Sequence, residues 1–243
     1  SYLGALNAFN AYQPKFVEVP TDNGGLIPEE LDKILETTPN CKFIYVIPDF
    51  QNPTGRTWSM ERRQKFMEVV NKHNLPVLED NPYGELRYEG TILPSLKSMD
   101  TKGLVMFLGT FSKIFCPGLR LGWIAAEHSL LSEFVKIKQS ADLHTSNFDQ
   151  GVADAYMAQY DLDEHVKEIV ALYKHRRDLI LESMEKYFPA GTEWTHPEGG
   201  LFLWLTFPEG VSARKVFNKC IEMKVAGVIG DAFYPNQKTD RSM

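Results

Sequence analysis

The side chains with the clearest chemical potential in this sequence are Lys113, Arg120 and Asp80. A lysine amine that its neighbours desolvate can act as a nucleophile. An arginine guanidinium can hold a phosphate through two parallel hydrogen bonds, and the hydroxyls of Thr110 and Ser112 add donors nearby. A carboxylate at the edge of a buried strand, such as Asp80, requires a cationic partner, which a protonated ring nitrogen would supply.

Three short apolar runs, rich in β-branched and aromatic residues, predict strands, and a polar cluster follows each run. In a doubly wound α/β domain, ligands bind at the carboxyl ends of the strands, so clusters that are distant in sequence would converge on one crevice. The strands and the clusters that follow them are 43–47 with 51–55, 76–79 with 80–83, and 104–108 with 110–113. This convergence by itself predicts a site.

A helix is predicted between the first two of these strands. Ser59 can cap its N-terminus, and residues 73–74 would end it. We expect its apolar positions to face the sheet, with Arg63 at the rim. The periodic positions are Arg63, Phe66, Met67 and Val70.

The remaining segments continue the alternation of strands and helices, which predicts an α/β protein with a parallel or mixed sheet. The last part has the pattern of a smaller α+β domain. The predicted elements are a strand over 122–126, a helix over 162–187 that Phe188-Pro189 stops, a strand over 201–207, a helix over 214–224 and a strand over 225–229.

Composition excludes several classes of protein. The formal net charge is -6, which argues against a nucleic-acid surface. No apolar run approaches the ~20 residues that cross a bilayer. The three cysteines are widely spaced and form no CxxC pair, so neither a metal site nor a disulfide framework is predicted. A reducing, cytoplasmic compartment fits best.

Each candidate residue also has an ordinary structural interpretation. Lys113 could be a solvated loop residue, Arg120 a surface ion pair, and Asp80 the cap of a turn. Asn52 before proline is a turn signal, and Tyr83 could be half-buried packing. Their occurrence together, in order and at the same edge of the sheet, favours a functional site.

With these motifs together, the chain resembles the fold-type I aminotransferases that use pyridoxal 5′-phosphate (PLP), and in particular the class I/II branch of the 2-aminoadipate and kynurenine aminotransferases. The resemblance covers nearly the whole chain, and four ordered motifs make it specific. The motifs are Asn52-Pro53-Thr54-Gly55, Asp80-x-x-Tyr83, Thr110-Phe111-Ser112-Lys113 and Pro117-Gly118-Leu119-Arg120-Leu121-Gly122.

The resemblance implies catalytic roles for three residues. Lys113 would form the Schiff base with PLP and later move the proton between the substrate Cα and the cofactor. Asp80 would pair with the pyridinium nitrogen, so that the ring can accept electron density. Tyr83, together with Asn52, would hydrogen-bond the 3-oxygen of the cofactor.

The other implied contacts complete the cofactor site. Thr110, Ser112 and Arg120 would hold the phosphate, and Tyr2 would stack on the face of the ring; simple core packing is an equal alternative for Tyr2. Thr110 stands where the family often has serine, but it keeps the hydroxyl. The N-terminal part of the family's large domain is expected to be missing. Arg241 is not assigned as the arginine that grips the substrate carboxylate, because its neighbours do not match.

The predicted fold is therefore a fold-type I PLP-dependent transferase, with a mostly parallel sheet flanked by helices and part of a small α+β C-terminal domain. We expect residues 1–160 to form the large PLP-binding domain, and residues 161–243 to form the connecting helix and the partial small domain. The predicted function is transfer of an α-amino group from an amino acid to a 2-oxo acid. We expect a homodimer without nucleic-acid or membrane partners, by analogy with the family.

Three alternatives stay open at this point. A PLP-dependent lyase, decarboxylase or racemase shares the same machinery, and substrate orientation decides which bond breaks. Some transcription regulators carry an aminotransferase-like effector domain beside a DNA-binding domain. A purely structural relative is disfavoured, because Lys113, Asp80 and Arg120 are all present.

Overall fold

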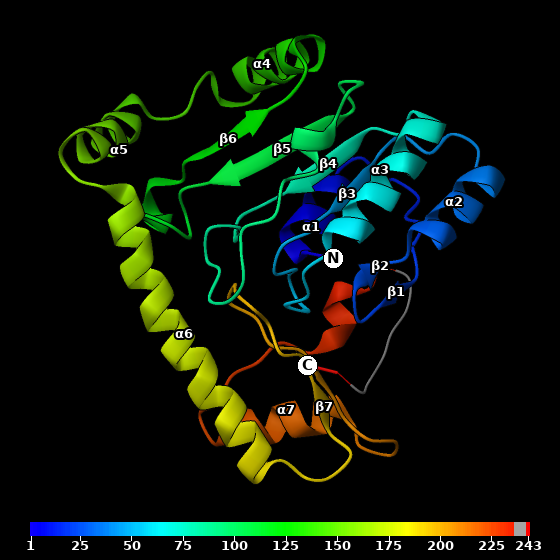
Figure 1. Ribbon diagram of the computed structural model, residues 1–243, viewed down its shortest axis with the longest axis vertical. Helices are drawn as coiled ribbons and strands as arrows, with labels where there is room; N and C mark the ends of the chain where they lie inside the picture. The colour runs from blue at the N-terminus through cyan, green and yellow to red at the C-terminus, as the bar shows by residue number, and fades with distance from the viewer. Residues whose placement is uncertain (236–241) are drawn as a thin grey trace.

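A four-stranded sheet forms the centre of the computed structural model, which describes residues 1–235 and 242–243 (Figure 1). The strand order is β3-β4-β5-β6; β3, β4 and β5 run parallel, and β6 is antiparallel to β5. The strands are β3 Ile44–Val46, β4 Val77–Asp80, β5 Val105–Thr110 and β6 Gly122–Ala125. This is the mostly parallel sheet that the sequence predicts, and each strand lies within one or two residues of its predicted position.

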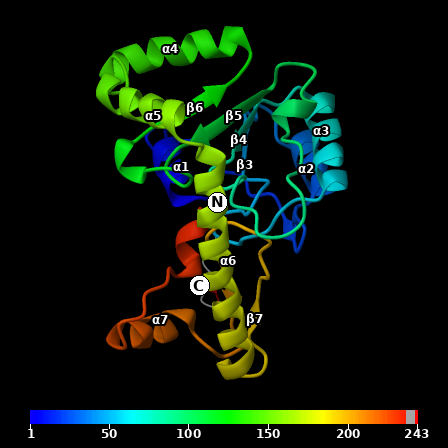
Figure 2. The ribbon, with the colours of Figure 1, turned by 60° about the vertical axis from the view of Figure 1, so that its left-hand side comes forward.

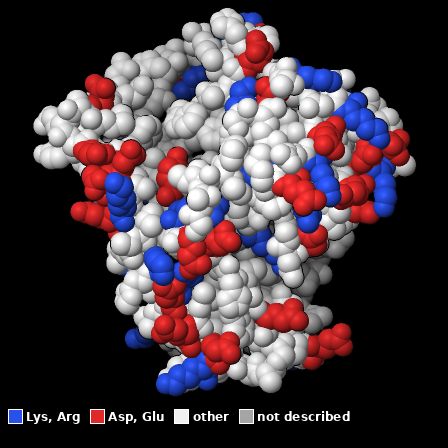
Figure 3. Space-filling view, viewed as in Figure 1, with Lys and Arg blue, Asp and Glu red and all other residues white. Residues whose placement is uncertain are grey.

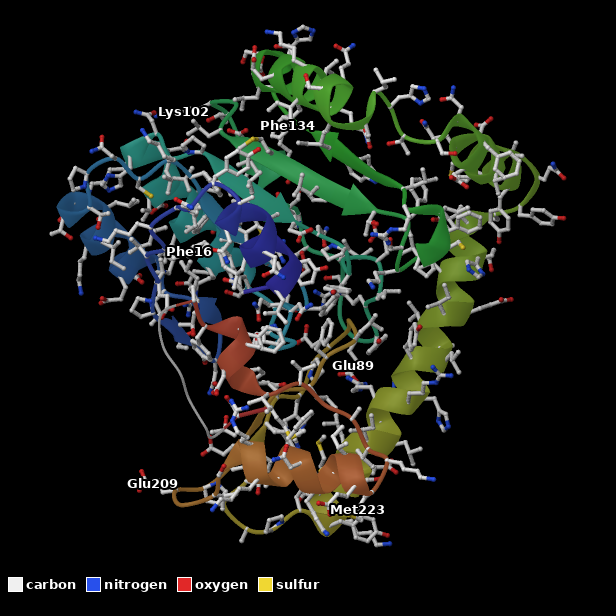
Figure 4. The ribbon with its side chains drawn as sticks, turned by 180° about the vertical axis from the view of Figure 1, so that it is seen from behind. Phe16, Glu89, Lys102, Phe134, Glu209 and Met223 are labelled. Carbon is white, nitrogen blue, oxygen red and sulfur yellow. The ribbon has the colours of Figure 1, made fainter. Side chains whose placement is uncertain are left out.

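Helices α1 and α3 lie on opposite faces of this sheet (Figures 1 and 4). The helices are α1 Leu3–Asn10, α2 Pro28–Thr37, α3 Met60–His73, α4 His128–Asp142, α5 Asn147–Gln159, α6 Leu162–Tyr187 and α7 Ala213–Glu222. The short 3₁₀ turns are η1 Lys97–Met99, η2 Pro117–Leu119 and η3 Gly230–Phe233.

Helix α3 begins and ends where the sequence predicts. The Ser59 hydroxyl accepts a hydrogen bond from the backbone N–H of Arg62 at 3.2 Å, which satisfies one of the free donors at the helix start. Asn74 adopts a left-handed conformation with φ 49°, and its N–H bonds to the carbonyl of Val70. Asparagine tolerates this conformation better than most residues, so the helix ends there.

The main core lies between α3 and the sheet. Strand residues alternate in direction, so every second side chain of β3, β4 and β5 points toward the apolar face of α3. The fully or almost fully buried side chains of this core include Val46, Phe66, Met67, Val70, Val77, Leu96 and Val105. On the other face, the Phe9 ring of α1 packs against Phe43 and Tyr45, with ring centroids 5.2 and 5.7 Å apart.

Helix α6 leads away from the sheet toward the C-terminal segments (Figure 2). Its bounds are those that the sequence predicts, and Asp161 caps it by accepting from the backbone N–H groups of Asp163 and Glu164. Two short antiparallel pairs complete the described strands: β1 Thr21–Asp22 with β2 Gly25–Leu26, and β7 Glu193–Trp194 with β8 Leu205–Thr206.

Two predicted strands near the C-terminus are wrong in extent or in kind. The run 201–207 forms a strand only at Leu205–Thr206, and 225–229 forms none. An apolar run becomes a strand only where a neighbouring strand pairs with it. Strand β8 has β7 and an isolated bridge to Ser242 as its described partners, whereas Val225 and Val228 are more than half exposed, at 57% and 51%.

The predicted place of Arg63 at the rim of α3 is also wrong. The side chain is fully buried, and its Nη2 lies 2.6 Å from Oδ1 of Asp49. Its other nitrogens donate to the backbone carbonyls of Trp58 and Pro94. A buried charge is tolerated when it is paired and hydrogen-bonded, and the partner Asp49 comes from the loop after β3.

Charges of both signs are mixed on the face of the molecule that Figure 3 shows. The ion pairs of the described residues include some between helices, such as Lys72 of α3 with Asp32 and Glu36 of α2 at 2.8 and 3.0 Å. Among the residues that the structure describes, no helix combines the length and the apolar composition that crossing a bilayer requires.

Candidate active site

The loop after β3 places Asn52 beside Tyr83. The Asn52 side chain is buried, and its Nδ2 lies 3.5 Å from the Tyr83 hydroxyl. Within the loop, the Gly55 N–H donates to the carbonyl of Gln51 at 2.6 Å. Gly55 has φ +69°, and a Cβ there would lie 2.6 Å from the backbone oxygen of Phe202. Only glycine meets both conditions without strain, which explains this position of the motif.

Asp80 is the last residue of β4, and a tyrosine from the neighbouring strand binds it. The Tyr45 hydroxyl donates to Oδ2 of Asp80 at 2.5 Å. Burial raises the pKa of Asp80 above its usual range, and the hydrogen bond from Tyr45 offsets only part of this rise. The same burial, with the nearby Asp80 charge second, raises the pKa of Tyr45. Asp80 is thus a partly desolvated carboxylate, and a cationic partner would stabilise its charged form.

Tyr45 is a residue that sequence reasoning missed. Its position inside an apolar strand suggested core packing. The register pairs Tyr45 with Leu78, and side chains two residues apart on a strand share one face, so Asp80 lies on the face of Tyr45. The alternation of side chains along each strand could be read from the sequence. Only the register between β3 and β4 shows that Tyr45 and Asp80 lie on the same face.

Thr110 and Ser112 stand together at the end of β5. The Thr110 hydroxyl lies 3.0 Å from both the Ser112 hydroxyl and the carbonyl of Leu121, and its single proton serves one of these acceptors. The N–H of Ser112 donates to the Thr110 hydroxyl at 3.1 Å. Lys113 follows in a turn and is half-buried. This arrangement gathers two hydroxyls next to the lysine.

Arg120 lies at the other end of the connection between β5 and β6. Residues Thr110 and Gly122 pair across these strands, so Arg120 returns to the sheet edge from which Lys113 leaves. Its backbone is left-handed with φ 54°, and its Nη1 donates to the Pro117 carbonyl at 3.2 Å. The rest of the side chain is exposed, which leaves donors available for an anion.

Tyr2 directly precedes α1, the helix whose Phe9 ring packs against Tyr45. Burial is the largest cause that raises the pKa of Tyr45 and that of Tyr83, the latter to about 12, and the nearby Tyr2 is a smaller cause of both shifts. The Tyr2 ring covers Gly4, where a Cβ would lie 2.6 Å from three of its atoms. With 42% of the residue exposed, Tyr2 is not a core residue in this structure.

Most of the predicted residues thus lie at or after the carboxyl ends of three adjacent strands, whereas Arg120 precedes β6 and Tyr2 precedes α1. Hydrogen bonds join two pairs of the predicted residues, Asn52 with Tyr83 and Thr110 with Ser112. Among the described residues, no hydrogen bond joins Lys113 to another of them. Arg241 lies outside the described residues. Residues 1–235 and 242–243 contain no group of three His, Cys, Asp or Glu side chains that could hold a metal ion.

The residues present fit PLP. Asn52 Oδ1 and Asn81 Oδ1 are buried and have no hydrogen-bond partner in the described part of the chain, although buried polar atoms are normally paired. An amine, a desolvated carboxylate and a guanidinium match the carbonyl, the ring nitrogen and the phosphate of this cofactor. The site therefore offers a complementary side chain to the carbonyl, the ring nitrogen and the phosphate of the cofactor.

Comparison with solved structures first defines the class of protein. The fold matches the Pyrococcus horikoshii kynurenine aminotransferase in complex with PMP, with a TM-score of 0.95 and 40% identity over 100% of this chain and 61% of that chain. It also matches the α-aminoadipate aminotransferase LysN from Thermus thermophilus, complexed with N-(5′-phosphopyridoxyl)-L-leucine, with a TM-score of 0.94 and 32% identity over 100% of this chain and 62% of that one.

The family model for aminotransferase class I and II matches residues 1–237, and the chain belongs to this family. The aromatic-amino-acid aminotransferase 1 of Thermococcus litoralis is 42% identical over 100% of this chain and 59% of its own length. The chain thus spans about three fifths of the length of such relatives. These comparisons confirm the predicted family, the fold-type I architecture, and PLP as the cofactor of the family.

Proposed function

We propose that the full-length protein is a PLP-dependent aminotransferase, which moves an α-amino group from an amino acid to a 2-oxo acid. The observation that carries this proposal is the placement of Lys113, Asp80 and the Asn52–Tyr83 pair after three adjacent strands of one sheet. An amine, a partly buried carboxylate and two neutral hydrogen-bonding groups at one edge suit the attachment and tuning of one ring-shaped cofactor.

Each residue of the site has a defined task in this proposal. PLP, when bound, supplies an electron-accepting ring that allows the proton at the substrate Cα to leave. The amine of Lys113 would hold the cofactor; once the substrate amine displaces it, it would be free to move that proton. Asp80 would keep a proton on the ring nitrogen, because a partly desolvated carboxylate favours a cationic neighbour. Asn52 and Tyr83 hydrogen-bond the ring oxygen.

The remaining predicted residues position the cofactor. Arg120 and the hydroxyls of Thr110 and Ser112 bind the phosphate, supported by the proximity of the two hydroxyls and the exposed guanidinium. Tyr2 covers the face of the ring, which its 42% exposure permits.

The test uses the full-length protein with added PLP. We expect a visible absorbance band that disappears on borohydride reduction, and we expect formation of a 2-oxo acid when amino acids are supplied with 2-oxoglutarate. Ammonia and pyruvate as the products would assign the protein to the β-lyases, and carbon dioxide would assign it to the decarboxylases. Absence of the band would contradict the proposal as a whole.

We propose further that the chain divides near residue 160, with residues 1–160 in the large cofactor domain and 161–243 as connecting helix and partial small domain. Support comes from α6, which begins at Leu162 and leaves the sheet layer (Figures 1 and 2). By analogy with the family we also propose a homodimer in the cytoplasm, with small-molecule substrates and without nucleic-acid or membrane partners.

A second candidate function is the effector domain of a transcription regulator. The HTH-type regulator YisV of Bacillus subtilis is 31% identical over 93% of this chain and 46% of its own length. A DNA-binding domain in the full-length protein, together with PLP binding but no turnover, would favour this candidate. Turnover of an amino acid and a 2-oxo acid, without a DNA-binding domain, would rule it out.

A further inference from the structure

Arg87 has a buried side chain, and only some of its hydrogen-bond donors have an acceptor among the described residues. Only 7% of its side chain is exposed. Its Nη1 lies 2.8 Å from Oε2 of Glu198 and donates to the carbonyl of Glu89 at 3.1 Å. Its Nη2 lies 3.6 Å from Oδ1 of Asp49, and neither Nε nor Nη2 has a hydrogen-bond partner among the described residues. Figure 4 shows Glu89 where the loop after β4 approaches the C-terminal segments near α6.

Neutralising Asp49 does not account for this arginine. Asp49 already has a fully buried cationic partner, Arg63 at 2.6 Å. Arg87 has a carboxylate partner of its own in Glu198 at 2.8 Å, but that side chain is 56% exposed. An ion pair with a solvent-exposed carboxylate offsets little of the cost of burying a guanidinium. The contact that distinguishes Arg87 is with a ring: its guanidinium carbon lies 4.8 Å from the centroid of Phe50, within the range of a cation–π interaction.

Phe50 needs such support because its backbone is unfavourable. It has φ +49°, a conformation that bulky residues rarely adopt, and its side chain has no exposed surface. Gly199 and Gly200 also approach Phe50 so closely that a Cβ at either position would lie 2.4 Å from a Phe50 side-chain atom. The conformation of Phe50 therefore depends on packing against Arg87 and these two glycines.

Phe50 connects this packing to the candidate active site. It comes two residues before Asn52, and it shares a buried cluster with Tyr83 and Leu86. The carbonyl of Leu86 accepts from the N–H of Gly200 at 2.9 Å, and Arg87 forms a β-bridge with Gly199. The segments that carry Asn52 and Tyr83 thus meet at Phe50 and Arg87, together with the segment that carries Gly199.

We propose that Arg87 is a positioning residue of the aminotransferase site: by holding Phe50 in its left-handed conformation, it fixes the Asn52–Tyr83 pair where that pair meets the cofactor. This inference rests on the proposed function. The Arg87 contacts described above include neither Asn52 nor Tyr83, so Arg87 acts through Phe50 and through the chain that joins it to Tyr83.

The experiment compares Arg87→Met, Arg87→Lys and the control Arg62→Met in the full-length protein loaded with PLP. Arg62 is a partly buried arginine whose side chain binds Asp22 and the carbonyl of Leu26. The readout is the pH midpoint at which the visible band of the bound cofactor changes. Donors to the ring oxygen favour its deprotonated form, so a displaced Asn52–Tyr83 pair raises the midpoint.

We expect Arg87→Met to raise the midpoint by roughly half a pH unit or more, Arg87→Lys to raise it less, and Arg62→Met to leave it unchanged. In the cofactor-free protein, amide hydrogen exchange over residues 50–56 should become faster in Arg87→Met than in Arg62→Met. If Arg87→Met fails to fold, Glu198→Gln replaces it, because the Glu198 side chain is 56% exposed; it should shift both readouts in the same direction.

An unchanged midpoint together with unchanged exchange over residues 50–56 in the Arg87 variant would overturn the inference while leaving the proposed function intact. Equal changes in the Arg87 and Arg62 variants would show that Arg87 only contributes to overall stability, and they would overturn the inference as well. Absence of the visible band in the wild-type protein would contradict the proposed function itself, so the two failures are distinguishable.

Discussion

The hydroxyl of Tyr45 donates a 2.5 Å hydrogen bond to the carboxylate of Asp80, which follows from the parallel pairing of β3 with β4. The bond joins β3 to the carboxyl end of β4, where the candidate site lies. It also partly offsets the loss of solvent at Asp80, because a hydrogen bond to the charged form lowers a carboxyl pKa whereas burial raises it.

Tyr45→Phe should therefore destabilise the protein. Removal of one hydrogen bond to a partly buried carboxylate is expected to cost about 1–2 kcal/mol of the free energy of unfolding, and it should raise the pKa of Asp80 further. Urea unfolding of the cofactor-free, full-length protein measures the loss. The control is Tyr12→Phe, since Tyr12 is 86% exposed. Equal stability of the two variants would show that the bond to Asp80 contributes nothing.

Glu79 should make the stability of the protein depend on pH. Burial raises its pKa from 4.5 to about 7, although the N–H groups of Leu96 and Lys97 each donate to the carboxylate at 2.8 Å. Because the folded form keeps its proton to a higher pH than the unfolded form, the contribution of Glu79 to stability falls as pH rises from about 4.5 to about 7. Over this window the fall is up to about 3 kcal/mol.

Glu79→Gln should flatten this part of the stability profile. The amide cannot titrate, so unfolding free energies measured in urea between about pH 4.5 and 7 should lose the decline that is due to this residue. At the acidic end of this window glutamine should also lower stability, because its amide nitrogen cannot accept from Leu96 or Lys97. A slope identical to that of the wild type would contradict the pKa shift of Glu79.

Two glycines provide a matched pair of substitutions. Gly55→Ala forces a Cβ to within 2.6 Å of the Phe202 backbone oxygen at φ +69°, and we expect a loss of about 2–3 kcal/mol. At Gly151, inside α5, an added Cβ would meet nothing within 4 Å among the described residues, so Gly151→Ala should stabilise the protein by up to about 1 kcal/mol. Thermal unfolding of both variants gives the comparison. Equal changes in thermal stability for the two variants would contradict the close approach of Gly55 to the Phe202 backbone oxygen.

The strands and the helix α3 could be predicted from the sequence because local signals agreed with one another. Ser59 and Asn74 mark the ends of a helix whose apolar face is periodic. The predicted loops then follow from the rule that ligands bind at the carboxyl ends of parallel strands. The candidate residues Asn52, Asp80 and Lys113 were found in this way, and their roles stay predictions.

The parts that could not be predicted depend on contacts between distant segments. Arg63 lies on the sheet side of α3 because Asp49, from another element, compensates its charge. Tyr45 belongs with Asp80 only through the register of β3 and β4. The run 225–229 has the composition of a strand but no described strand beside it, and composition alone cannot supply a partner.

The proposed chemistry depends most directly on the amine that carries the cofactor. The full-length protein should be loaded with PLP, reduced with borohydride and digested, and the modified lysine should be located by mass spectrometry. We predict a single phosphopyridoxyl group on the peptide that contains Lys113, and none in Lys113→Ala. Stable labelling of a different lysine, or equal labelling of the Lys113→Ala variant, would contradict the assignment of this site.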